Sequence, residues 1–171
     1  TRFFDKKTLM MGLMSLAGVL SLALYFVPPD NISAVFALNL AIGFVLGPKS
    51  PLAFSMHADS ADYNEWRTGR RATAMTFSAA TFSQKLGGAL ASACIGWLLA
   101  LLGYVANTAQ NAGSQQGILW LMSVIPGVVA LVAAAVMWFY PLTEAQLRQI
   151  QAELATRRGL PAVDADDVMS K

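Results

Sequence analysis

Charged residues are scarce in this chain of 171 residues: they make up 13% of it, about half the share usual in soluble domains. Hydrophobic residues reach 56%, which excludes an ordinary soluble globular domain. A single cysteine, Cys94, rules out a disulfide framework within the chain and is best explained as a small packing residue. The net charge of only +2 gives no support for a nucleic-acid partner.

Long apolar stretches are what the chain has instead. Four of them approach or exceed the about 20 residues that a helix needs to cross the hydrocarbon layer. They cover residues 8–27, 32–56, 72–105 and 117–140. The sequence therefore predicts an all-α membrane protein with four transmembrane helices.

Basic residues are distributed on one side of this predicted topology. They precede the first stretch, separate the second from the third and follow the fourth: Arg2, Lys6, Lys7, Arg67, Arg70, Arg71, Arg148, Arg157, Arg158 and Lys171. The opposite connectors contain none, so the positive-inside rule places both termini and residues 57–71 in the cytoplasm. Residues 1–7 are basic and lack an initiating Met, so we interpret them as the remnant of a cytoplasmic loop in a fragment of a longer protein.

The second stretch contains signals for a break. Pro48 and Pro51 predict a kink near Pro48, because proline lacks the backbone donor and clashes with the preceding turn. Simple curvature and a cavity wall both remain open as explanations. Lys49 and Ser50 are candidates for lining such a cavity, although the Lys49 side chain is also close enough to the predicted cytoplasmic end to extend toward it.

Lys85 lies deep within the third stretch. Arg71 precedes it by about 14 residues and Tyr104 follows by about 19, so neither membrane surface is within reach of its side chain. An ammonium at the bilayer centre costs about 2.5 to 3.5 kcal/mol, so Lys85 needs an acidic partner, and none is obvious in the chain. Ser78 and Thr81 share a helical stripe with Lys85 and could line a cavity, or their hydroxyls could bond to their own helix.

A dense group of charges follows the second stretch, in residues 57–71. Asp59, Asp62, Glu65 and Arg71 are the candidates for an ion-pair network that closes in one conformation and opens in another. A plain solvated loop remains the alternative, because exposed ion pairs contribute little.

The end of the chain, residues 141–171, becomes amphipathic. Thr143 and Gln146 have the spacing of a capping box. Apolar residues then recur at helical spacing: Leu147, Ile150 and Leu154. We expect a short cytoplasmic helix here, followed by a disordered acidic tail from residue 160.

Three motifs together resemble one transporter family. They are the run Ala58–Arg71 (ADSADYNEWRTGRR), the segment Gln84–Gly88 (QKLGG) and the segment Gly103–Asn107 (GYVAN). This combination resembles the glycoside-pentoside-hexuronide cation symporters, the melibiose-permease-like branch of the major facilitator superfamily, and the resemblance covers nearly the whole chain. It implies the last four spans of a twelve-helix transporter that moves a sugar or glycoside with Na⁺ or H⁺, or with Li⁺, by alternating access in a bacterial inner membrane.

The resemblance also implies roles for individual residues. Lys85 would face the cation and sugar site, with Thr81 nearby, while carboxylates of the missing N-terminal half would be its partners. Asp59, Asp62, Glu65 and Arg71 would form the family's cytoplasmic gating network. The other expected partner is membrane lipid. We expect no nucleic acid, no cofactor beyond the coupling ion and no confident metal-ligand set in this chain, while Lys49 departs from the family pattern.

Two other classes of function remain as rivals. An intramembrane enzyme could use Lys49, His57 or Asp59 as acid or base, but His57 is the only histidine and lies at the end of a predicted span. A free-standing four-span subunit without transport activity of its own is the main alternative.

Overall fold

The computed structural model describes residues 5–28 and 30–158, and the regular structure in them is helical throughout. The elements are α1 (Lys6–Leu24), α2 (Ile32–Leu46), α3 (Lys49–Thr68), α4 (Thr73–Leu101), α5 (Ala112–Leu119), the π-helical η1 (Trp120–Val124), α6 (Ile125–Trp138) and α7 (Glu144–Arg157). Four helical units are long and apolar enough to cross a membrane: α1, α2 with α3, α4, and α5 through α6. The predicted all-α membrane fold with four spans is confirmed.

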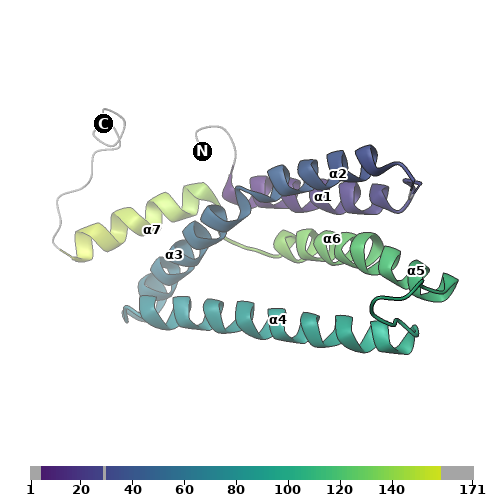
Figure 1. The fold of residues 1–171 in the computed structure, drawn as a ribbon. Coiled ribbons are helices and arrows are strands. Elements are labelled where there is room, and N and C mark those ends of the chain that lie inside the picture. Colours follow the sequence, from purple (N-terminus) through teal and green to yellow (C-terminus); the bar gives the residue numbers. More distant parts are fainter. Residues whose placement is uncertain (1–4, 29, 159–171) are drawn as a thin grey trace.

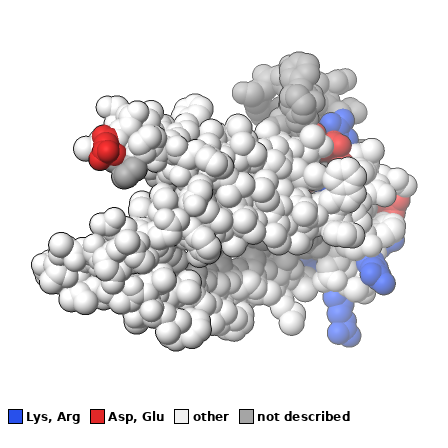
Figure 2. Space-filling view, turned by 90° about the vertical axis from the view of Figure 1, so that its right-hand side faces the viewer, with Lys and Arg blue, Asp and Glu red and all other residues white. Residues whose placement is uncertain are grey.

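The connections alternate between two ends of the structure. The first turn of α1, the α3–α4 turn and α7 lie at one end, whereas the α1–α2 and α4–α5 connections lie at the other (Figure 1). On the face drawn in Figure 2, most of the surface is uncharged and the basic side chains gather toward one edge. This agrees with the one-sided charge pattern of the sequence. The assignment of the basic end to the cytoplasm stays a prediction.

Helices α1 and α6 form a close pair. Gly18 of α1 and Gly127 of α6 face each other where the helices cross, and a Cβ atom built on either would lie 3.1 Å from the other's carbonyl oxygen. Small residues at such a crossing let two backbones approach, which is how membrane helices gain van der Waals contact. A buried stripe runs along α1 on this side: Met10, Met14, Ala17, Gly18, Ser21 and Leu24.

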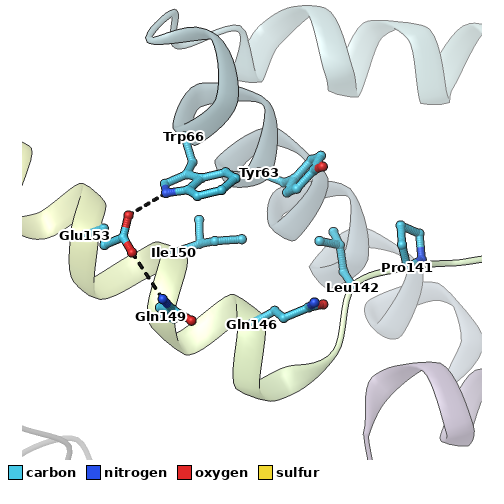
Figure 3. A pocket seen from close by; sticks show the side chains of 8 residues that line it. All are labelled: Tyr63, Trp66, Pro141, Leu142, Gln146, Gln149, Ile150 and Glu153. Carbon is cyan, nitrogen blue, oxygen red and sulfur yellow. Dashed lines mark hydrogen bonds between the residues drawn. The ribbon is translucent and has the colours of Figure 1, made fainter.

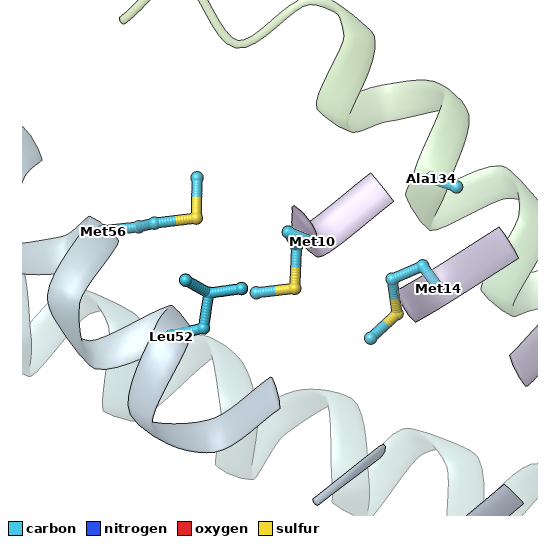
Figure 4. Packing of buried hydrophobic residues seen from close by; sticks show 5 residues of the cluster. All are labelled: Met10, Met14, Leu52, Met56 and Ala134. Atoms are coloured by element: carbon cyan, nitrogen blue, oxygen red, sulfur yellow. The ribbon is translucent and has the colours of Figure 1, made fainter. Parts of the chain in front are cut away.

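A small apolar core joins this pair to α3. Its buried members are Met10, Met14, Leu52, Met56 and Ala134, from α1, α3 and α6 (Figure 4). The unbranched thioether side chains of methionine adapt to the irregular space where three helices meet. The core thereby fixes α3 relative to α1 and α6.

The break predicted near Pro48 is present. Helix α2 ends at Leu46 and α3 begins at Lys49, with a turn at Gly47 and Pro48 between them. Figure 1 shows α3 diverging from the line of α2 toward α4. The break therefore turns α3 out of the line of α2 and onto α4.

Residues 57–71 are not the loop that their charge suggested. Helix α3 continues to Thr68, and Gly69, with φ of +69°, ends it in the left-handed conformation that glycine tolerates. No glycine or proline occurs between Pro51 and Gly69, so nothing interrupts the helix despite its charge.

The limits of the third and fourth spans also differ from the expected ones. Helix α4 ends at Leu101 rather than near residue 105. Helix α5 begins at Ala112, five residues before Gly117, because the Asn111 side chain accepts a hydrogen bond from the Ser114 amide at 2.7 Å and caps it. The predicted disordered tail lies outside the described residues.

Candidate functional site

Lys85 lies on the exposed surface of α4. No residue of α4 is buried, and the helix contains no acidic residue. Lys85 forms no ion pair with any residue that the structure describes. The acidic partner that its depth demands is therefore not in the described part of the chain.

A cavity of about 220 Å³ lies between α3 and α4, and we call it the α3–α4 cavity. Its lining comprises Lys49, Ser50, Ala53, Phe54 and His57 from α3 with Phe77, Ala80, Thr81 and Gln84 from α4. Both sets recur at helical spacing, because each helix presents one face to the space. Three predicted site residues thus come together: Lys49, Ser50 and Thr81. Ser78 and Lys85 are not part of this lining.

Three aromatic rings form one end of the α3–α4 cavity. Phe54 and Phe77 stack with ring centroids 6.4 Å apart and an interplanar angle of 15°. The His57 ring packs edge-on against both, at 6.3 Å from Phe54 and 6.2 Å from Phe77. The imidazole is therefore held in place by packing on rings from both helices.

The predicted charged network is only partly formed from the residues expected. Asp59 is buried and accepts a hydrogen bond from the Lys6 amine at 2.7 Å, which joins α3 to α1. Glu65 lies 4.0 Å from Arg71, whose side chain is 68% exposed, so that contact is weak. Asp62, on the same helix, forms no ion pair with the residues that the structure describes.

The strongest partner of Glu65 is Arg158, just after α7, which the sequence alone did not identify. The Arg158 guanidinium donates to both carboxylate oxygens, at 3.1 and 2.5 Å. These hydrogen bonds to Glu65 raise the pKa of Arg158 above its usual value. The two residues are 93 positions apart, and no local sequence pattern connects them.

Helix α7 packs against α3 through an apolar face with a polar edge. The capping box of Thr143 and Gln146 is confirmed. The predicted apolar positions are buried together with Leu142 beside Tyr63 and Trp66: Leu147, Ile150 and Leu154. The Trp66 indole nitrogen donates to Glu153 at 2.6 Å (Figure 3). The amphipathic pattern of α7 predicted the helix, but it gave no information about its partner on α3.

Lys7 completes the charged end. Its amine donates to the carbonyl oxygens of Trp138 and Tyr140, both at 2.8 Å, where α6 ends. A cation at this position satisfies carbonyls that have no partner within the helix. Together with Lys6, it holds the first turn of α1 against α3 and α6. No group of three or more residues suited to bind a metal ion occurs among the residues that the structure describes.

Comparisons with known proteins agree with this architecture. The family model for the MFS/sugar transport protein matches residues 1–144. The chain is 36% identical over 151 residues to an uncharacterized 29.9 kDa protein from the crtE 3′ region of Pseudescherichia vulneris. This match covers 88% of this chain and 55% of that protein. No solved structure matches the chain.

Two relatives from Escherichia coli K12 carry functional names. The inner membrane symporter YicJ is 34% identical over 152 residues, and the glucuronide carrier protein homolog is 30% identical over 158 residues. These matches cover 88% and 92% of this chain but only 33% and 34% of the relatives, so the chain spans about a third of their length. The chain thus belongs to the MFS/sugar transport protein family, in its branch of glycoside-pentoside-hexuronide cation symporters.

Proposed function

We infer that the chain forms the C-terminal four spans of a bacterial inner-membrane transporter that moves a sugar or glycoside together with Na⁺ or H⁺. Family membership supports transport, and the names of relatives supply the terms inner membrane, symporter and glucuronide carrier. Helices α2 and α4 have no buried residue, so most of their surface is available to the remaining spans of a larger bundle.

The observation that carries this proposal is the position of Lys85. An ammonium group in the middle of a 29-residue membrane helix is costly unless an acid faces it. In the proposal, carboxylates of the N-terminal half face Lys85 across the interface between the halves. A bound cation would compete with Lys85 for these carboxylates, and this competition couples the ion to the sugar.

The charged end around α3 has a second role in the proposal. Asp59 and Glu65 already bind Lys6 and Arg158, which fixes α3 to α1 and to the segment after α7. Asp62 forms no ion pair within the described residues and Arg71 only a long one, so both would pair with the N-terminal half when the cytoplasmic side is closed.

Replacing Lys85 with glutamine in the complete transporter tests the coupling. We expect Lys85→Gln to abolish accumulation of labelled sugar against its gradient. Without a bound cation, the N-terminal carboxylates would then lack the positive charge that Lys85 supplies. Downhill sugar equilibration, measured in the same vesicles, should be retained at least in part.

Arg70→Gln is the matched control, since Arg70 is exposed at the charged end and its side chain has no ion pair within the described residues. It removes one positive charge and should accumulate sugar like the wild type. Normal accumulation by Lys85→Gln would refute the coupling role.

A further inference from the structure

The α3–α4 cavity is lined by basic and neutral polar groups but by no acidic one. Lys49 contributes an ammonium, His57 an imidazole, and Ser50, Thr81 and Gln84 contribute hydroxyl and amide groups. Helix α4 contains no aspartate or glutamate, and the acids of α3 begin at Asp59, which faces Lys6 instead. A cavity with this lining favours an anion and disfavours a bound metal cation.

The charge of Lys49 is available to a ligand. Lys49 is exposed and forms no ion pair with a residue that the structure describes. None of the lining side chains Ser50, Thr81 and Gln84 forms a hydrogen bond within the described part of the chain either. The side-chain hydrogen bonds of α3 and α4 come from other residues, namely Asp59, Ser60, Glu65, Trp66, Thr68 and Thr76. The cavity therefore holds several hydrogen-bond donors that have no partner among the described residues.

The two helices place Lys49 and Gln84 at the end of the cavity away from the aromatic rings. His57 of α3 contacts Phe77 of α4, and α4 runs back from the α3–α4 turn at an angle to α3 (Figure 1). Eight residues back along α3 leads to Lys49, and seven residues forward along α4 leads to Gln84, which are similar distances at about 1.5 Å per residue. Lys49 and Gln84 are therefore expected to lie on opposite walls of the same end.

The size and chemistry of the cavity suit one end of a small polar ligand. Its volume of about 220 Å³ is below the roughly 300 to 1,000 Å³ of pockets that hold drug-sized ligands. The rings of Phe54 and Phe77 line the cavity and supply apolar surface for the C–H groups of a sugar ring. Hydroxyl and amide groups can bind sugar hydroxyls, and an ammonium can bind a carboxylate or sulfonate through a charge-assisted hydrogen bond.

We propose that the α3–α4 cavity is a subsite for the negatively charged group of an acidic sugar, with Lys49 as the residue that selects for the charge. This inference rests on the proposed transport function and names its substrate class, an anionic sugar rather than a neutral glycoside. The alternative is that the Lys49 side chain extends to the membrane surface and does not contact the charged group of the substrate.

The test compares a charged and a neutral substrate of otherwise equal structure. Binding of 4-nitrophenyl β-D-glucuronide and of 4-nitrophenyl β-D-glucoside is measured by equilibrium dialysis on the complete transporter in phosphatidylcholine nanodiscs. Uptake of the same pair is measured in membrane vesicles. The variants are Lys49→Gln, Lys49→Arg and, as the matched loss of a distant positive charge, Arg70→Gln.

We expect the wild type to prefer the glucuronide, and Lys49→Gln to lose about tenfold or more of its affinity for it, as removal of a charged hydrogen-bond partner does. Its affinity for the glucoside should stay the same. Lys49→Arg should keep most of the preference, and Arg70→Gln all of it. A glucuronide affinity that is unaffected in Lys49→Gln, or an equal loss for both substrates, would overturn the assignment.

The binding measurement separates this inference from the proposed function. If the wild type prefers the glucuronide to the glucoside in binding but does not transport it, the transport proposal is refuted and the subsite is supported. A wild type that accumulates the glucoside and does not bind the glucuronide would overturn the subsite and support transport. Failure to bind either compound would also overturn the subsite.

Discussion

Helices α1 and α4 are both apolar and both contain glycine, yet they are packed very differently. Helix α1 has a continuous buried stripe and meets α6 at Gly18. Helix α4 is longer, but none of its residues is buried, and a Cβ atom added at Gly87 or Gly88 would have no neighbour within 4 Å among the described residues. The glycine-containing face of α1 therefore packs against another helix of the chain, whereas the face of α4 that contains Gly87 and Gly88 is exposed.

The largest expected effect is at the α1–α6 crossing. Gly18→Leu would place a side chain against the Gly127 carbonyl oxygen, 3.1 Å from the new Cβ, and this backbone atom cannot move without separating the helices. Overpacking of this kind costs about 1 to 3 kcal/mol, and occasionally more. The apparent Tm of the protein in detergent should fall sharply, with a lower yield of monodisperse material.

Gly12→Leu is the matched control on the same helix. A Cβ at Gly12 has no neighbour within 4 Å, so the same substitution there should leave the apparent Tm nearly unchanged. Equal losses at the two positions would mean that helix propensity or insertion, rather than the crossing, determines the effect.

The next effect concerns the ion pair that ties α1 to α3. Asp59→Asn leaves the Lys6 amine, whose side chain is 25% exposed, without its carboxylate partner. Because water still reaches Lys6, we expect a loss of about 1 to 2 kcal/mol in the free energy of unfolding, measured by denaturant titration in detergent. Asp62→Asn is the control and should cost less, since Asp62 forms no ion pair with the described residues.

A smaller effect is expected where α7 packs on α3. Trp66→Phe keeps an aromatic ring beside Leu147 and Ile150 but removes the donor to Glu153, 2.6 Å away. The loss should be about 1 kcal/mol, seen as faster amide hydrogen exchange confined to α7. Trp97→Phe, at a side chain that is 65% exposed on α4, should leave exchange in α7 unchanged. Unaltered exchange in Trp66→Phe would show that apolar contacts alone hold the helix.

Local signals in the sequence predicted much of this structure. The length of the apolar runs indicated the four spans, Pro48 indicated the break, and Thr143 with Gln146 indicated the start of α7. Charge density was a poor guide to backbone conformation, because residues 57–68 are helical until Gly69 ends α3. The π-helical segment before Pro126 was not predicted, since its form depends on how the fourth span accommodates a proline without a backbone donor.

The candidate site was less predictable because it depends on contacts between distant residues. Asp59 binds a lysine 53 positions away and Glu65 an arginine 93 positions away, and no periodicity encodes either pair. Spacing alone predicted that Ser78, Thr81 and Lys85 share one face of the helix and could line a cavity together. Helix α3 covers the neighbouring stripe instead, with Phe77 and Gln84, so Thr81 alone of the three lines the α3–α4 cavity.

The smallest effect on the chain's own stability is expected on α4, and it tests the contrast between α1 and α4 most directly. Gly88→Leu meets nothing within 4 Å among the described residues, so the apparent Tm of the chain alone should hardly change. In the complete transporter, the same substitution should reduce transport strongly if α4 packs closely against the other half, because a leucine at a tight helix contact separates the backbones. Val132→Leu, on a residue of α6 that is 55% exposed, is the conservative control for a larger apolar surface. Normal transport by Gly88→Leu would mean that this face of α4 contacts lipid, and the contrast with α1 would then reflect position in the bundle rather than a missing protein partner.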